Sequence, residues 1–281
     1  MLDRLCTVKK IITGQNATDG AGVKLVRVFG HSDTKDFDPF LMLDAFDSTN
    51  PNDYIKGFPW HPHRGIETIT YLINGNIEHG DSLGNKGSIL DGQCQWMTAG
   101  SGIIHQEMPK ASNRMLGVQL WLNLPSKDKM AAPHYNGIVK EDIPVIDEGD
   151  KKIHIISGMY NGNPGAVEGH YIKPLYLDVE VDPSAEWSLA IEQDATLFIY
   201  ILQGEGCFGP DKDDFISAKH AILFNKGNRF MVKTSDQGIR FLLMSGQPLN
   251  EPIAWGGPIV MNTKEELDLA FKELEENKFI K

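Results

Sequence analysis

Short segments with the composition of β-strands, separated by turn residues, recur along almost the whole chain. They are rich in β-branched, aromatic or alternating apolar residues, and glycine, asparagine and aspartate stand between them. Such close spacing predicts an all-β chain built from antiparallel barrels or sandwiches. The segments of the first half are Lys24–Phe29, Phe40–Phe46, Glu67–Ile73, Ser88–Leu90, Gln93–Thr98, Ile103–Met108 and Leu116–Leu124. Those of the second half are Ile153–Ser157, Pro174–Val181, Trp187–Glu192, Thr196–Gln203, Ala221–Asn225, Phe230–Lys233 and Ile239–Ser245.

The segment Pro125–Asp150 separates these two regions, and its lysines, prolines and acidic residues predict a surface connection. Tyr71-Leu-Ile-Asn-Gly-Asn76 in the first region is similar to Tyr200-Ile-Leu-Gln-Gly-Glu205 in the second. The match suggests two copies of one β-barrel, although chance similarity between two β-domains also explains a match this weak. We therefore expect an N-terminal barrel over residues 1–135 and a C-terminal barrel over residues 150–281.

Turn and capping residues predict local structure at three places. Asn74-Gly75 favours a hairpin with a type I′ turn, and Leu83–Gly87 reads as a second turn. Thr263-Lys-Glu-Glu266 is a capping box that begins an amphipathic helix, Thr263–Asn277, packed on a domain face and ending the C-terminal barrel. The apolar residues at helical spacing in this helix are Leu267, Ala270, Phe271 and Leu274.

Charge and cysteine usage narrow the class of protein. The 27 Lys and Arg residues against 38 Asp and Glu residues give a net charge of −11, which argues against direct nucleic-acid binding. Three scattered cysteines, Cys6, Cys94 and Cys207, form no disulfide framework and favour a reducing compartment. Apolar runs such as Leu197–Leu202 are too short to span a membrane, and no signal peptide is recognisable. We expect a soluble cytoplasmic protein that acts as a monomer.

Three of the nine histidines lie in two short motifs with the spacing of metal ligands. His61 and His63 are two residues apart in Trp60-His-Pro-His-Arg-Gly65, and His105 stands two residues before Glu107. Residues two apart in a strand point to the same face, so each pair projects together. Three imidazoles and a carboxylate suit a divalent first-row metal, with Fe(II), Mn, Ni, Cu and Zn all possible. Four such ligands leave two positions of an octahedral shell open.

The other candidates are weaker. Glu67 competes with Glu107 as the carboxylate, since it shares strand parity with His61 and His63, but a straight strand would place it about 13 Å from His63. We therefore favour Glu107. His79 stands two residues before Asp81 and suits an exposed turn, although a place at the barrel mouth or behind the metal ligands is also possible. A structural role is the default for His31, His134, His154, His170 and His220.

Longer motifs in the same order along the chain resemble the pirin family, a branch of the cupin superfamily. The resemblance covers nearly the whole sequence. Its motifs are Asp38-Pro-Phe-Leu-Met-Leu-Asp44, His61-Pro-His-Arg-Gly-Ile-Glu-Thr68, Asp81-Ser-Leu-Gly-Asn-Lys-Gly87, Trp96-Met-Thr-Ala-Gly-Ser-Gly-Ile-Ile-His-Gln-Glu-Met-Pro109, Gln119-Leu-Trp-Leu-Asn-Leu-Pro125 and Pro252-Ile-Ala-Trp-Gly-Gly-Pro258.

The resemblance implies a bicupin, in which two cupin-type β-barrels follow one another. It implies one iron-type metal in the N-terminal barrel, most typically Fe(II), held by His61, His63, His105 and Glu107. The general cupin pattern would use a carboxylate at the position of Glu67, and the pirin branch uses the glutamate of the second motif instead. The C-terminal repeat lacks the ligand pattern, which implies a barrel without a metal site.

The resemblance also implies a function. Some pirins resemble quercetin 2,3-dioxygenases, which use O₂ to open the ring of a flavonol and release carbon monoxide. Glu107 would then take the proton of the flavonol 3-hydroxyl, and Phe58, Trp60 and Trp121 would form apolar walls around the small aromatic substrate. The alternative is a metal- or redox-responsive regulatory protein, similar to the transcription co-regulators among animal pirins. The acidic charge then favours a protein partner over DNA. A cupin with another substrate remains a third interpretation.

Overall fold

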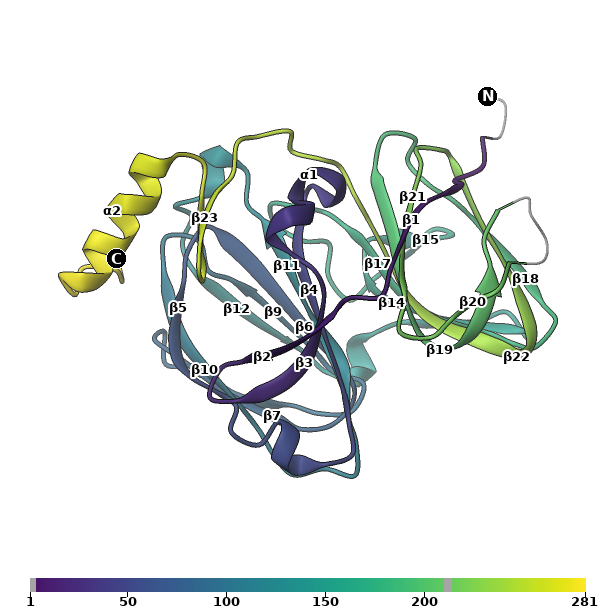
Figure 1. Ribbon diagram of the computed structural model, residues 1–281, viewed down its shortest axis with the longest axis horizontal. Helices are drawn as coiled ribbons and strands as arrows, with labels where there is room; N and C mark the ends of the chain where they lie inside the picture. Colours follow the sequence, from purple (N-terminus) through teal and green to yellow (C-terminus); the bar gives the residue numbers. More distant parts are fainter. Residues whose placement is uncertain (1–3, 210–213) are drawn as a thin grey trace. The chain divides into compact units, whose positions relative to one another are not determined.

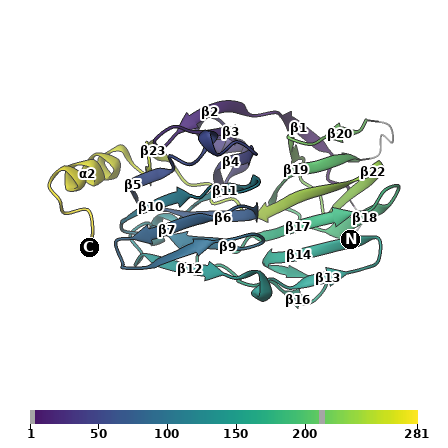
Figure 2. The ribbon, with the colours of Figure 1, turned by 90° about the horizontal axis from the view of Figure 1, so that it is seen from below.

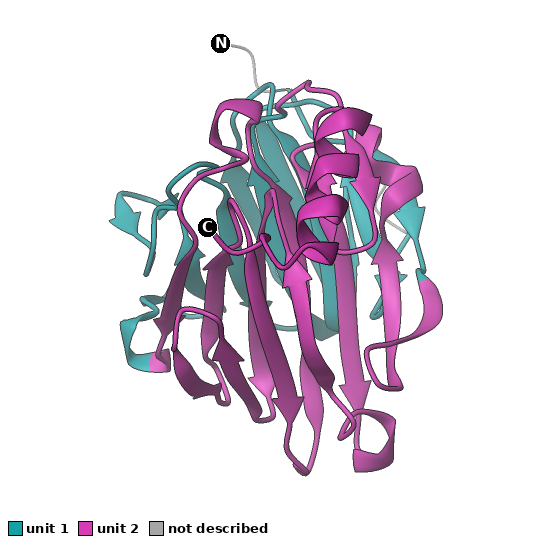
Figure 3. Ribbon diagram, turned by 90° about the vertical axis from the view of Figure 1, so that its left-hand side faces the viewer, with its two compact units in different colours: residues 1–14, 141–248 teal, residues 15–140, 249–281 magenta. Residues whose placement is uncertain are grey.

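The computed structural model describes residues 4–209 and 214–281, and its regular structure is mostly β-strand (Figure 1). The chain divides into two compact units, each built from stretches that are not continuous in sequence (Figure 3). We call residues 15–140 with 249–281 the first barrel, and residues 1–14 with 141–248 the second barrel. The predicted all-β class is confirmed. No helix among the described residues is long and apolar enough to cross a membrane.

Two antiparallel sheets form the first barrel. Its strands are β2 (Gln15–Asp19), β3 (Val23–Phe29), β4 (Phe40–Ser48), β5 (Phe58–His63), β6 (Ile66–Asn74), β7 (Ile77–Asp81), β8 (Lys86–Ile89), β9 (Cys94–Thr98), β10 (Ile103–Pro109), β11 (Met115–Asn123) and β12 (His134–Ile138). The seven-stranded sheet has the order β12-β9-β6-β11-β4-β3-β2, and the four-stranded sheet has the order β5-β10-β7-β8. Figure 2 shows strands of both sheets from below. A short helix α1 (Thr34–Phe37) precedes β4.

Polar side chains form the middle layer of the first barrel's interior. Along β6, Ile66 belongs to one apolar cluster and Leu72 to another, and the two threonines between them share the same face. Strands β4 and β11 repeat this order, and β10 places two polar residues after its apolar Ile103. We call this layer the polar belt; its members are Asp44, Thr68, Thr70, His105, Glu107 and Gln119.

The second barrel has an apolar core instead. Its strands are β1 (Val8–Ile12), β13 (Val145–Asp147), β14 (Lys151–Ser157), β17 (Leu175–Val181), β18 (Glu186–Ala190), β19 (Thr196–Cys207), β20 (Ile216–Ser217), β21 (Ala221–Phe224) and β22 (Arg229–Gly246), with a small hairpin of β15 (Met159–Tyr160) and β16 (Asn163–Pro164). The order of the main sheet is β1-β21-β19-β22-β17-β14-β13. Buried aromatic rings in mutual contact fill the core: Trp187, Phe208, Phe224, Phe230 and Phe241.

The structure corrects the predicted domain boundaries, 1–135 and 150–281, at both ends of the chain. Strand β1 pairs with β21 and belongs to the second barrel, whereas residues 249–281 belong to the first. The predicted surface connection is also too long, because β12 within it pairs with β9 as an edge strand of the first barrel. Contacts so distant in sequence leave no local pattern, which is why periodicity missed them.

Two local predictions are also wrong. Asn74-Gly75 closes no hairpin, because β6 pairs with β9 and β11 while β7 pairs with β8 and β10 in the other sheet. The chain crosses between the sheets there. The predicted strands Phe230–Lys233 and Ile239–Ser245 are parts of one long strand, β22. The second predicted turn, within Leu83–Gly87, does connect the hairpin of β7 and β8.

The predicted amphipathic helix is confirmed as α2 (Lys264–Glu275), but it packs on the first barrel (Figure 3). The Thr263 hydroxyl accepts from Glu266 N and the Glu266 carboxylate accepts from Thr263 N, so both halves of the capping box form. The apolar side of the helix meets the short hairpin of β23 (Ala254–Gly256) and β24 (Ile259–Met261). We call residues 249–281 the closing segment.

The closing segment holds the turn between β5 and β6. The buried Arg64 guanidinium pairs with Glu273 at 2.7 Å and donates to the Phe279 carbonyl at 2.7 Å. The buried Lys129 ammonium donates to the carbonyl oxygens of Gly65 and Val260, at 2.8 and 2.9 Å. Buried charges are tolerated when hydrogen bonds satisfy them in this way.

The turn requires glycine at position 65. Gly65 has φ +77°, and a Cβ built on it would lie 1.9 Å from the Val260 carbonyl oxygen. We expect Gly65→Ala to lower the free energy of unfolding by several kcal/mol, because backbone atoms must move. Gly84→Ala is the matched control, since Gly84 has φ +91° and an added Cβ meets nothing within 4 Å. It should cost only its conformational strain, about 1–3 kcal/mol. Thermal unfolding of both variants checks this, and equal losses would contradict it.

Candidate metal centre

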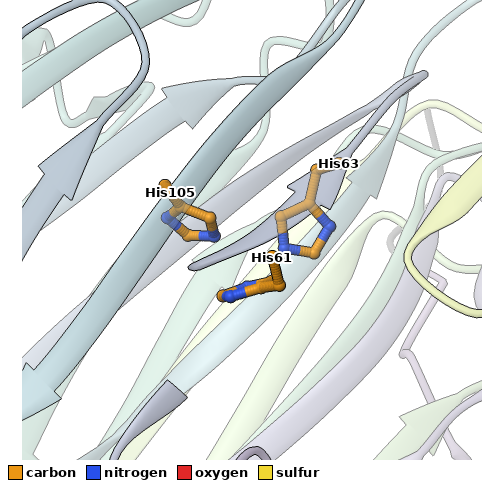
Figure 4. Close-up of side chains that lie close together, drawn as sticks. All are labelled: His61, His63 and His105. Carbon is orange, nitrogen blue, oxygen red and sulfur yellow. The ribbon is translucent and has the colours of Figure 1, made fainter. Parts of the chain in front are cut away.

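Two neighbouring strands bring three histidines together. Strands β5 and β10 pair antiparallel, with His61 directly opposite His105 and His63 opposite Ile103. Directly opposite residues of an antiparallel pair share a face, so the three imidazoles project together (Figure 4). Their ring centroids are 4.3 to 5.0 Å apart, and one nitrogen from each lies within 4.8 Å of the others. The two sequence motifs thus converge as side-chain parity predicted.

Hydrogen bonds determine which ring nitrogens remain free. His61 Nδ1 lies 2.8 Å from the Pro59 carbonyl oxygen, and His63 Nδ1 lies 3.1 Å from that of Pro258. Each Nδ1 therefore carries the proton and donates it, which leaves a lone pair on Nε2. Both ring nitrogens of the fully buried His105 lack a hydrogen-bond partner among the described residues. A buried nitrogen without a partner is costly and requires an explanation.

The electrostatics favour neutral imidazoles. Burial, with a smaller contribution from neighbouring His61, lowers the pKa of His63 to about 3. Burial likewise lowers the pKa of His105 well below its ordinary value, and the charges of His63 and His61 add to the effect. Neutral imidazole is the form that binds a metal. Three imidazole nitrogens at this separation fit a divalent first-row metal, which would also give His105 a partner.

Glu107 lies on the same face of β10 as His105 but is held by other side chains. The Gln119 amide donates to its two carboxylate oxygens at 2.9 and 3.0 Å, and the Thr70 hydroxyl donates at 3.2 Å. Trp121 Nε1 donates to Oε1 of the Gln119 side chain at 3.1 Å and fixes the orientation of its amide. The Glu107 oxygens are outside the group of atoms within 4.8 Å of one another. Its role as a fourth ligand stays a prediction.

The histidine cluster opens onto a cavity of about 490 Å³ in the first barrel. Trp121 and Trp255 form an aromatic wall, with ring centroids 5.9 Å apart, and Trp121 also contacts His63. Arg27 and Asp44 form a polar wall, joined by two hydrogen bonds of 2.8 and 3.0 Å.

Of the three aromatic residues predicted as walls, Phe58 and Trp121 line the cavity and Trp60 does not. Trp60 is 54% exposed. A β-bulge in β5 explains the difference, because the register with β10 shifts between the pair His61–His105 and the pair Phe58–Glu107. The bulge brings Phe58 to the face of His61 despite their odd spacing, and leaves Trp60 facing outward.

Glu67 is excluded as a metal ligand by its direction. Thr70 on β6 reaches Glu107 inside the barrel, and Glu67 is three residues away on the same strand, so it points to the opposite face. The sequence suggested one continuous strand, in which Glu67 would share a face with His61 and His63. The turn at Arg64-Gly65 separates β5 from β6, so this alternation does not continue to Glu67. The Thr98 hydroxyl donates to the Glu67 carboxylate at 2.7 Å. Glu67 therefore points away from the histidine cluster, and the choice of Glu107 stays a prediction.

His79 is not the exposed turn histidine that the sequence favoured. It is buried on β7 and pairs with the buried carboxylate of Asp81 at 3.1 Å. Sequence reasoning also gave no role to Gln119, Trp255 and Pro258. All three stand in motifs that carried the family resemblance, which was the available signal.

The fold and the histidine cluster together define a two-barrel member of the cupin class. The Pirin family model matches residues 22–122, and the model of the pirin C-terminal cupin domain matches residues 176–280. The chain belongs to the pirin family. A pirin-like protein of Solanum lycopersicum is 40% identical over 271 residues, covering 96% of this chain and 91% of that protein. Pirin of Homo sapiens is 38% identical over 262 residues, covering 92% and 89%.

A solved structure is also similar over the whole chain. The crystal structure of quercetin 2,3-dioxygenase from Acinetobacter baumannii superposes with a TM-score of 0.88 and is 30% identical, covering 98% of each chain.

The buried Glu67 makes stability depend on pH. Burial raises the pKa of Glu67 from 4.5 to about 7, against smaller opposing effects of hydrogen bonds from Thr98 and Trp96. A raised pKa contributes stability that is present below pH 4.5 and is lost as pH rises through 7. We expect Glu67→Gln to match the wild type near pH 4 and to exceed it above pH 7, by on the order of a few kcal/mol. Denaturant unfolding across this range checks the prediction, and a constant difference would contradict it.

Proposed function

We propose that this pirin is a metal-dependent dioxygenase that cleaves a flavonol such as quercetin with O₂. His61, His63 and His105, with Glu107 as fourth ligand, would hold one Fe(II) ion, although Mn, Ni, Cu or Zn also suit these donors. The observation that carries the proposal is the convergence of three imidazoles, two of which line an aromatic-walled cavity. The similarity to the Acinetobacter baumannii quercetin 2,3-dioxygenase supports the substrate class.

The cavity suits a flat aromatic molecule. Its volume of about 490 Å³ lies within the usual range for small-molecule sites. Trp121 and Trp255 offer ring faces and edges for stacking, which favours an aromatic ligand over an aliphatic one. The polar wall of Arg27 and Asp44, with the neighbouring Asp19 bonded to Arg27, provides donors and acceptors for the hydroxyl groups of a polyphenol.

Glu107 would act as the base in this reaction. A metal ion bound here would orient the flavonol oxygens and stabilise their negative charge. Glu107 lines the cavity and would take the proton of the 3-hydroxyl, since the flavonolate anion is the form that reacts with O₂. Gln119 and Thr70 hold the carboxylate in one orientation, so it need not reorganise when substrate arrives.

Purified Fe(II)-loaded protein should bleach quercetin and release carbon monoxide. His61→Ala should lose the metal and the turnover together, because one of three converging nitrogens is removed. Glu107→Gln should lower the turnover by roughly 10²–10⁴-fold through loss of the base. The exposed His170→Ala of the second barrel is the control and should behave as wild type. Absorbance at the flavonol band, a carbon monoxide assay and elemental analysis measure these effects.

Two outcomes would count against the proposal. Equal turnover by the wild type and His61→Ala would show that the histidine cluster is not the reaction site. Stoichiometric metal without any turnover would remove the dioxygenase function and favour the regulatory alternative, in which a protein partner recognises the metal-loaded state.

A further inference from the structure

A second pair of buried titratable residues stands directly behind the histidine cluster. On β7, His79 lies opposite Glu107 and Asp81 lies opposite His105, so all four side chains share one face. The side chains of His79 and Asp81 have no exposed surface. The His79 ring stacks on Tyr135 at 4.6 Å between centroids and lies 5.6 Å from the His105 ring. His79 is therefore packed against a proposed metal ligand without reaching the cavity.

Asp81 determines which nitrogen of His79 carries the proton. The Asp81 carboxylate accepts from Leu83 N at 2.9 Å and from Asn85 N and Nδ2 at 3.0 and 2.9 Å. It is thus an acceptor on every side, and His79 Nε2, 3.1 Å from its Oδ2, must be the protonated nitrogen. In neutral His79 this leaves Nδ1 as a bare acceptor.

The unpartnered nitrogens of the two rings complement one another. His79 Nδ1 and both ring nitrogens of His105 are buried without a hydrogen-bond partner among the described residues. A metal takes a lone pair from one His105 nitrogen, so the other carries the proton and requires an acceptor. His61 and His63 already have such acceptors in the Pro59 and Pro258 carbonyls. His105 has no such backbone acceptor among the described residues, and His79 is the neighbouring side chain with a bare nitrogen.

We propose that His79, held in one tautomer by Asp81, is a positioning residue that accepts the ring N–H of His105 when His105 binds metal. The inference rests on the proposed metal site. The pair completes a chain from carboxylate to histidine to ligand histidine, so Asp81 sets the orientation of a ligand to which it is not hydrogen-bonded. Partners of this kind typically strengthen metal binding 10–100-fold.

Two amide substitutions separate the two nitrogens of His79. His79→Gln places its amide near the position of Nε2, so it keeps the Asp81 hydrogen bond and loses the acceptor toward His105. His79→Asn places its amide near the position of Nδ1 and keeps that acceptor. We expect Ni(II) affinity to fall roughly 10–100-fold in His79→Gln and to be largely retained in His79→Asn.

Asp81→Asn tests the tautomer itself. The NH₂ group of an asparagine at this position would donate to His79 Nε2. His79 would then carry its proton on Nδ1 and present a donor, in place of an acceptor, to His105. The Asn85 side chain can turn its amide oxygen toward the new amide group. Oδ1 of residue 81 still accepts from the backbone N–H groups of Leu83 and Asn85. Ni(II) affinity should fall at least as far as in His79→Gln, while thermal unfolding of the metal-free variant stays near that of wild type.

Thr68→Val is the matched control, because the Thr68 hydroxyl is another buried polar atom of the belt without a partner. It should leave Ni(II) affinity unchanged. Chelator competition gives the affinities, and ¹⁵N shifts of the histidine rings report the His79 tautomer. Wild-type affinity in His79→Gln and Asp81→Asn, or a loss in Thr68→Val alone, would overturn the inference. Absence of Ni(II) binding by the wild type would instead overturn the metal site on which it rests.

Discussion

Burying polar side chains inside a β-barrel costs free energy unless each one finds a partner, and the first barrel depends on meeting that cost. Its polar belt lies between two apolar clusters, and Asp44, Glu107 and Gln119 of the belt line the cavity. Glu107 is satisfied by Gln119 and Thr70, and Asp44 by Arg27. Among the belt residues, the buried atoms without a partner are both ring nitrogens of His105 and the Thr68 hydroxyl, and His79 beside His105 adds a further bare nitrogen.

The same need for partners applies to the buried charges that bond to the closing segment. Arg64 and Lys129 are buried cations at the turn between β5 and β6, and each is bonded to carbonyl oxygens or a carboxylate. Burial lowers the pKa of Lys129 to about 7, with opposing effects of Glu251 and Glu266. These contacts fix the backbone on both sides of the turn, so the directions of His61 and His63 are set by packing and not by their own strand alone.

How much could be predicted depended on the range of the interaction. The HxH and HxE patterns predicted convergent histidines because strand parity is local, and the capping box at Thr263 predicted α2 for the same reason. The bulge that turns Trp60 outward and the reset of parity before Glu67 needed the actual register. The burial of His79 and the carbonyl of Pro258 beside His63 arise from chain crossings that no local pattern encodes.

The interleaved ends of the two barrels have a consequence for the order of events during synthesis. The Pro258 acceptor of His63 lies 195 residues further along the chain. Strand β1 likewise pairs with β21, which is made much later. Loops of this length close slowly, and neither barrel is complete when its middle strands leave the ribosome. His63 therefore gains its Nδ1 acceptor only after the closing segment has been made and has packed on the first barrel.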